Sequence, residues 1–248
     1  MNTSTFLFLV KDEFRRRNST KHSNKWWMFY VAAGILIGLI FAAVFADNLD
    51  PYGVMFMSFG FPYITFIIAF SIVIREWKNG TAGWWLTLPY PRRSLILSKY
   101  AASICTAVIM HIIFWVGAQL FVAYALILKG SFDFYSLAAF MKTSAIWYGV
   151  IMMVIPFMAA FGTLTGVVSR SRLKPLTPML WIIYGLSGNS LFWILESPHI
   201  NKLQLAQNPN EIFTVQSHEF GWIALGIILL SGILISAATV LMNKQVEG

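Results

Sequence analysis

Six apolar stretches, each about as long as a membrane-crossing helix, constrain this chain most. They occupy residues 26–46, 54–74, 101–128, 145–168, 176–195 and 220–242. A helix needs about 20 consecutive apolar residues to cross the hydrocarbon core of a bilayer. Charged residues make up 11% of the chain, against about 25% in soluble domains. This is too few to cover the water-exposed surface of a soluble protein of this size. The sequence therefore predicts an all-α integral membrane protein with six transmembrane helices, and it excludes a water-soluble enzyme.

The basic residues lie on one side of this predicted topology. Fifteen of the 18 Lys and Arg residues fall in residues 1–25, 75–100 and 169–175 or in the tail after the last stretch, and three fall in the opposite loops. Because Lys and Arg concentrate in cytoplasmic loops, both termini are predicted to be cytoplasmic, and residues 196–219 to form an extracellular loop. The net charge of +8 thus reflects membrane topology and does not indicate a nucleic-acid partner. We expect residues 1–248 to form a single transmembrane domain.

Polar side chains inside the apolar stretches are few. His111 and Gln119 lie two helical turns apart in the third stretch, and Ser187 and Asn189 lie in the fifth, so these four are candidates for a substrate path. The alternative for His111 is a hydrogen bond to a neighbouring helix. Ser187 also falls in a GxSG pattern that is found in intramembrane serine proteases. That chemistry needs a histidine base, and the last stretch contains none.

No metal or nucleotide site is predicted. Glu196, His199, His218 and Glu219 lack the spacing of zinc ligands, and Cys105 is the single cysteine. The sequence also lacks the GxxxxGKS/T loop that binds nucleotide phosphates. We therefore expect no cofactor bound by this chain and no ATPase activity of its own, so that any ATP and Mg²⁺ would be used by a partner subunit.

Two pairs of glycines are spaced four residues apart. Gly34 and Gly38 lie in the first stretch, and Gly162 and Gly166 lie in the fourth. Glycines at this spacing allow two helix backbones to approach closely in a membrane. Each pair predicts either packing within one bundle or a contact between two subunits.

The first 25 residues predict an amphipathic helix on the inner leaflet. Phe6, Val10 and Phe14 are spaced by four, and basic residues follow from Lys11 onward. Such a helix lies in the membrane interface with its apolar side buried among the lipids. The alternative is a disordered basic tail.

Residues 75–100 are too polar to cross the bilayer and too apolar to be a solvated linker. Five large side chains in it would be costly to leave in water: Trp77, Trp84, Trp85, Leu86 and Leu88. Either a partner protein or an aromatic belt at the membrane interface would cover them. Pro89 and Pro91 end any preceding helix, and Pro91 suits the start of the next one. The segment predicts a short amphipathic helix, a rigid turn and a long helix.

The same segment resembles the permeases of ABC type-2 exporters, and most of all the branch for lantibiotic protection and antibiotic resistance. The shared pattern is an acidic residue after the second helix, a Gly-Thr pair, a Leu-rich stretch, a proline, one or two basic residues and a later lysine. This chain supplies Glu76, Gly80, Thr81, Leu86 to Leu88, Pro89, Arg92, Arg93 and Lys99. The six-helix layout and the amphipathic N-terminal helix fit as well.

The resemblance implies that the segment contains a coupling helix, which docks in a cleft of a cytoplasmic ATPase subunit. The residues implied in this coupling are Glu76, Trp77, Gly80, Thr81, Trp84, Trp85, Leu88, Pro89, Arg92 and Arg93. Two ATPase copies would work with this permease and a second permease subunit, the same or related, in a bacterial plasma membrane. The expected function is export of an amphipathic peptide or antibiotic-like substrate. Two other classes remain open: a non-transporting membrane anchor or sensor partner of an ATPase, and a secondary transporter.

Overall fold

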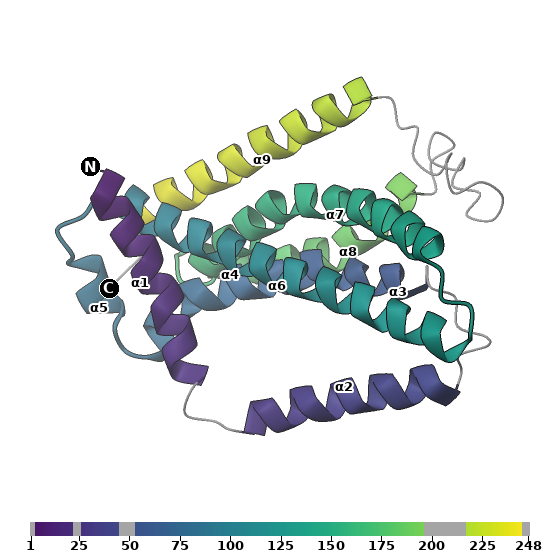
Figure 1. Cartoon of the computed structure of the whole chain (residues 1–248). Coiled ribbons are helices and arrows are strands. Elements are labelled where there is room, and N and C mark those ends of the chain that lie inside the picture. The colour runs from purple at the N-terminus through teal and green to yellow at the C-terminus, as the bar shows by residue number, and fades with distance from the viewer. Residues whose placement is uncertain (1–2, 22–25, 45–52, 196–216, 245–248) are drawn as a thin grey trace.

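The computed structural model describes residues 3–21, 26–44, 53–195 and 217–244, and the regular elements of this part are all helices (Figure 1). Most of the predicted extracellular loop at 196–219 lies outside the described residues. The α-helices are α1 (Thr3–Lys21), α2 (Trp26–Val44), α3 (Gly53–Phe56), α4 (Gly60–Lys78), α5 (Ala82–Leu86), α6 (Arg92–Leu128), α7 (Phe134–Val168), α8 (Thr177–Leu195) and α9 (Ser217–Lys244). Two 3₁₀ helices, η2 (Met57–Phe59) and η3 (Lys174–Leu176), complete the set.

Four segments of the described part are long and apolar enough to cross a membrane: Gly53–Lys78, Arg92–Leu128, Phe134–Val168 and Gly221–Lys244. This confirms the prediction of a helical membrane protein. The other two predicted stretches fall in α2 and α8, which have 19 residues each. The count of six membrane crossings therefore stays a prediction.

The long helices extend beyond the apolar stretches that the sequence marks. α6 begins at Arg92, directly after Pro91, and α7 begins at Phe134. The carboxylate of Asp133 caps α7 by accepting a hydrogen bond from the Ser136 amide at 3.3 Å, as expected at a helix N-terminus. The second stretch is interrupted by η2 before α4 begins at Gly60. Pro62 lies in the first turn of α4, where a missing amide proton costs little.

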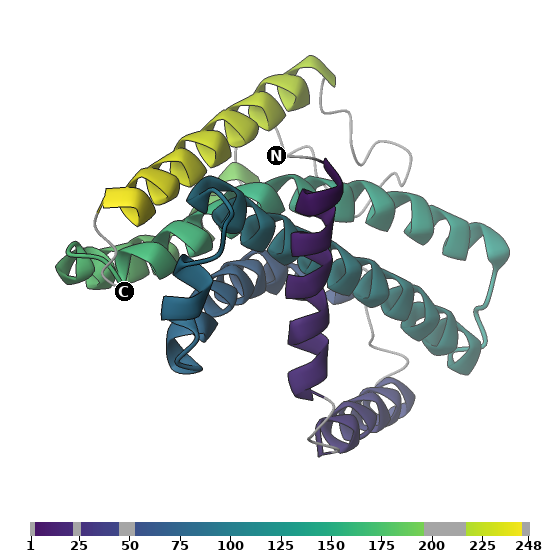
Figure 2. The same ribbon diagram turned by 90° about the vertical axis from the view of Figure 1, so that its left-hand side faces the viewer.

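α7 is the central helix, because it contacts α4, α6, α8 and α9. Helices α2 and α9 flank the central group on opposite sides, and α1 lies across α6 at a steep angle (Figures 1 and 2). The start of α1, the short helix α5 and the last residues of α9 lie at one end of the bundle (Figure 1). The connection from α6 to α7 lies at the other end.

The two glycine pairs have different surroundings. A Cβ atom on Gly162 would collide with the carbonyl oxygen of Phe66, and one on Gly166 would lie 2.8 Å from the Cβ atom of Val73. Both contacts are with α4, so this pair brings α4 and α7 together within the subunit. A Cβ atom on Gly34 or Gly38 would have nothing within 4 Å among the described residues.

The apolar core at the α5 end joins helices that are distant in sequence. It contains buried residues from α1, α4, α5, α6, α7 and α9: Leu9, Val73, Trp85, Leu95, Ile96, Ala160, Val167, Ile235, Ala238 and Met242. Trp77, Leu86 and Leu88 pack against this cluster. The short helix α5 is therefore anchored in the same core as the long helices.

Candidate functional site

The candidate site begins at the C-terminus of α4, where the chain reverses. The amide of Gly80 donates to the carbonyl oxygen of Trp77 at 3.2 Å, and the amide of Thr81 donates to that of Glu76 at 2.9 Å. This pair of bonds is a Schellman motif, and Gly80 occupies its left-handed position with φ +69°. A residue with a side chain would be strained there, so Gly80 fixes the direction in which the chain enters α5.

The adjacent tryptophans of α5 lie in opposite environments. Trp85 is 2% exposed and packs edge-to-face with Trp77, with ring centroids 6.0 Å apart. Trp84 is 57% exposed, and Gly83 and Thr87 beside it are exposed as well. One tryptophan therefore anchors α5 in the bundle, and the other presents a large apolar surface outward.

A buried cluster of charges lies beneath α5. The Lys99 ammonium lies 2.9 Å from Oε1 of Glu76 and 2.6 Å from Oε1 of Glu13. Oε2 of Glu13 accepts a hydrogen bond from Nη2 of Arg75 at 2.7 Å, and Oε2 of Glu76 accepts one from the Thr81 hydroxyl at 2.6 Å. The cluster thus connects α1, α4 and α6 to the residue that precedes α5.

The cluster is balanced in charge and shielded from solvent. It contains two carboxylates and two cations, and the Lys99 side chain has 0% exposure. The Lys99 ammonium also lies 4.7 Å from the centroid of the Trp85 ring, a cation–π geometry. Removing one member of a buried ion pair costs about 3–5 kcal/mol, because the charge that remains is uncompensated. Each charged residue therefore constrains the position of the others.

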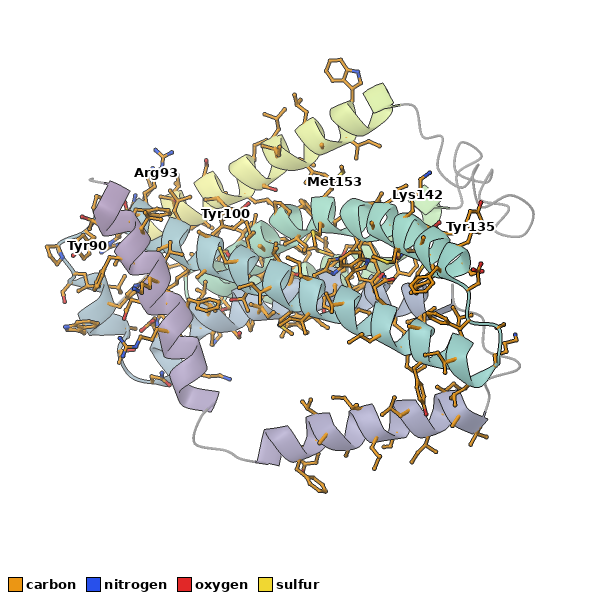
Figure 3. All side chains as sticks on the ribbon, in the orientation of Figure 1. Tyr90, Arg93, Tyr100, Tyr135, Lys142 and Met153 are labelled. Carbon is orange, nitrogen blue, oxygen red and sulfur yellow. The ribbon has the colours of Figure 1, made fainter. Side chains whose placement is uncertain are left out.

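The two arginines at the start of α6 point in different directions. Nη1 of Arg92 donates a hydrogen bond to the carbonyl oxygen of Met242 at 2.7 Å, which attaches α6 to the C-terminus of α9. A cation there also complements the helix dipole. Arg93 is exposed, and its side chain points away from the bundle (Figure 3). Arg92 thus ties two helices together, whereas Arg93 is accessible to a partner.

The linker between α5 and α6 is partly covered. Leu88 packs against the core cluster, while Pro89 is exposed. Together with Trp84, Thr87 and Arg93, Pro89 gives this end of the molecule an exposed surface of apolar and basic character. Such a surface is suited to binding a protein and carries no catalytic group.

The polar candidates for a substrate path lie on two helices, α6 and α8. His111 is fully buried, and its Nε2 donates to the carbonyl oxygen of Tyr148 on α7 at 3.3 Å. Nε2 of Gln119 donates to the Ser144 hydroxyl on the same helix at 2.9 Å. These bonds join α6 to α7, and a substrate-contacting role for either residue stays a prediction.

The fifth-stretch candidates lie on α8. The Ser187 hydroxyl donates to the carbonyl oxygen of Tyr184 at 2.7 Å, and the side chain of Asn189 lies outside the described part. No group of three or more His, Cys, Asp or Glu side chains with metal-binding geometry occurs within residues 3–21, 26–44, 53–195 and 217–244.

Glu13 and Arg75 are the members of the charge cluster that the sequence analysis did not name as site residues, and Glu13 is the less expected of the two. The sequence predicts a helix on the inner leaflet, with the side that carries Phe6, Val10 and Phe14 buried among the lipids. Among the residues of α1 whose side chains the structure describes, Leu9 and Glu13 are buried, and they are four residues apart. The spacing of Glu13 four residues after Leu9 was the available signal.

A family model described as ABC-2 family transporter protein matches residues 2–220 of the chain. The comparisons with curated proteins and with solved structures gave no match. The matched region includes α1, α4, α5 and α6, and hence all four charged residues of the cluster. Because the match covers most of the chain, the protein belongs to the ABC-2 transporter family.

Proposed function

We propose that this chain is the membrane-spanning permease subunit of an ATP-binding-cassette exporter. Membership of the ABC-2 family supports a membrane component that works with an ABC ATPase subunit. The sequence has no phosphate-binding loop, so ATP and Mg²⁺ would be used by that separate subunit. The observation that carries the proposal is the exposed Trp84 on a short helix whose opposite side is fixed by buried charges.

This geometry suits the transmission of movement. Trp85 on the inner side of α5 belongs to a core that also includes α1, α4, α6, α7 and α9. Close-packed cores deform little, so a displacement of α5 by a bound ATPase would be passed to these helices. An exposed aromatic belt would need no such anchoring of its opposite side.

The site residues divide into three groups under this proposal. Trp84, Thr87 and Arg93 would contact the ATPase, because they are exposed around α5. Gly80 and Pro89 would set the direction of the chain on either side of α5. The remaining residues would hold α5 and the start of α6 in place from within: Glu76, Trp77, Thr81, Trp85, Leu88, Arg92 and Lys99.

The orientation and the composition of the complex are part of the proposal. The basic side chains near α5, with α1 and the end of α9, support a cytoplasmic location of this end in a bacterial plasma membrane. By resemblance, two ATPase copies and a second permease, the same or related, would complete the exporter. Six crossings would include α2 and α8. An amphipathic peptide or an antibiotic-like compound is the substrate class that the resemblance favours.

The proposal is tested by co-purifying the chain with a candidate ABC ATPase subunit from the same organism, and by assaying both in proteoliposomes. Trp84→Ala should weaken association, and Trp222→Ala is the matched control, since Trp222 is an exposed tryptophan on α9. For Trp84→Ala we expect the Kd of the complex with the ATPase to rise by more than about 30-fold, because truncation of an aromatic hot spot commonly costs over about 2 kcal/mol. Equal association of both variants would refute α5 as the docking helix. Association without ATP-driven export would favour a membrane anchor or sensor.

A further inference from the structure

Helix α1 is attached to the bundle through one narrow face. Leu9 and Glu13 on this face are buried, whereas Leu7, Lys11 and Arg15 are exposed. Leu9 enters the core cluster that also contains Trp85. In both views α1 lies across α6 near the α5 end of the bundle (Figures 1 and 2). One apolar and one acidic side chain therefore fix α1 at this end.

Both oxygens of the Glu13 carboxylate are used, and each binds a different helix. Oε1 lies 2.6 Å from the Lys99 ammonium on α6, and Oε2 lies 2.7 Å from Nη2 of Arg75 on α4. A carboxylate with two charged partners is held in position more strictly than a single apolar contact would hold it. Glu13 thus ties the N-terminal helix to the ends of two long helices at once.

The connection continues to α5. Lys99 shares its ammonium between Glu13 and Glu76, and Glu76 accepts a hydrogen bond from the Thr81 hydroxyl at 2.6 Å. Thr81 is the residue that precedes the first turn of α5. An unbroken series of charge-assisted bonds therefore runs from α1 to the start of α5.

We infer that Glu13 is a positioning residue of the coupling apparatus, and that it makes α1 and α5 move as one body. The inference rests on the proposed function, because it takes α5 to be the contact with the ATPase. Under it, α1 is more than a membrane-surface anchor. It carries the movement of α5 across the cytoplasmic end of α6.

The charge count suggests the variants for a test. Glu13→Gln leaves two cations with one carboxylate in the buried cluster. Glu13→Gln combined with Arg75→Gln restores neutrality and retains the Lys99–Glu76 pair. Lys11→Gln is the matched control, since it removes one charge from the exposed face of the same helix.

The readout is the distance between spin labels at Arg15→Cys and Thr87→Cys, two exposed positions, in a Cys105→Ser background. Distances are measured by double electron–electron resonance, first on the chain alone in nanodiscs. They are then measured on its complex with the ATPase, without nucleotide and after trapping with ADP and vanadate.

We expect a narrow distance distribution in the otherwise unaltered chain and in Lys11→Gln, unchanged by vanadate trapping. Glu13→Gln should broaden the distribution in the chain alone and let it shift on trapping. ATPase co-purification should stay within about twofold of that of the equally labelled parent chain, because Glu13→Gln adds no change to the exposed surface around Trp84. The double variant should have the thermal midpoint of the chain with the intact cluster but should keep the broad distance distribution. If Glu13 only balanced charge, the neutral double variant would have a narrow distribution again.

A distribution that stays narrow in Glu13→Gln would overturn the inference, and so would one that narrows again in the double variant. A distance that changes on trapping in the otherwise unaltered chain would do the same. The measurement on the chain alone needs no ATPase. Failure of the ATPase to bind would therefore count against the proposed function and leave the test of Glu13 intact.

Discussion

Replacing the buried tryptophan of α5 should destabilise the protein far more than replacing its exposed neighbour. Trp85 is 2% exposed, contacts Trp77 and lies under the Lys99 ammonium, whereas Trp84 is 57% exposed. Truncation of a buried tryptophan to alanine costs about 3–5 kcal/mol. The lost cation–π contact adds to this cost, since such contacts contribute about 0.5–2 kcal/mol. An exposed substitution usually changes stability by less than about 0.5 kcal/mol.

The difference should be measurable as a thermal midpoint in detergent. For a chain of this size, each kcal/mol shifts the midpoint by about 2–4 °C, so Trp85→Ala should lower it by about 6 °C or more. Trp84→Ala should leave it within about 2 °C. Trp85→Phe keeps an aromatic ring beside Lys99 and should fall between the two. The assay is size-exclusion chromatography of heated, fluorescently tagged protein, with expression level recorded beside it.

The two variants should also separate in their effect on the ATPase. Trp84→Ala should weaken binding of the ATPase without a change in the fold. Trp85→Ala should weaken this binding only indirectly, because α5 is no longer held against the core. Equal midpoints for the two alanine variants would show that Trp85 does not anchor α5. The division of α5 into an inner and an outer side would then be wrong.

Three further predictions concern other parts of the fold. Gly166→Leu should lower the thermal midpoint by several degrees or abolish expression, because overpacking commonly costs about 1–3 kcal/mol, while Gly34→Leu should have little effect on the isolated subunit. Equal tolerance of both would contradict the close contact of α4 with α7. Arg92→Ala should destabilise the protein by about 1.5–3 kcal/mol, since a charge-assisted hydrogen bond to the end of α9 is lost. Amide hydrogen exchange should become faster in the last turn of α9, and an unchanged exchange rate there would refute the role of Arg92 in holding this helix end. In a cysteine-free background, a cysteine at Thr87 should react with a membrane-impermeant maleimide only from the cytoplasmic side, and a cysteine at Ser131 should react only from outside. Labelling of both cysteines from one side would exclude the proposed topology.

Local chemistry made part of the site predictable. Gly80 follows the C-cap residue Asn79 of α4, and a glycine at that place indicates a left-handed helix end, which the structure has. Pro91 predicts the start of a helix, and α6 begins at the next residue. Composition alone predicts the helical membrane class. The helix ends depend on residues that are close together in sequence, and the membrane class depends on the apolar composition of the chain. Neither requires knowledge of contacts between distant segments.

The remaining features depend on contacts between distant segments. Lys99 and Glu13 are 86 positions apart, and the register of Glu13 with Leu9 does not indicate which helices that face of α1 contacts. The sequence does not indicate which of Trp84 and Trp85 is buried, because a helix of five residues is too short for hydrophobic periodicity to define a face. The two glycine pairs have the same spacing, yet only Gly162 and Gly166 meet another helix in the described part.

The composition of the charge cluster supports a role in geometry more than in stability. A buried ion pair costs so much desolvation that apolar residues of similar volume often stabilise a protein equally well or better. An apolar cluster at Glu13, Glu76 and Lys99 would join the same helices, but apolar contacts have no direction and allow helices to slide. Charge-assisted hydrogen bonds fix both distance and angle, and both carboxylates use both of their oxygens. Such an arrangement holds α5 in one orientation relative to α1, α4 and α6, as a helix that transmits an ATPase movement without slipping would require.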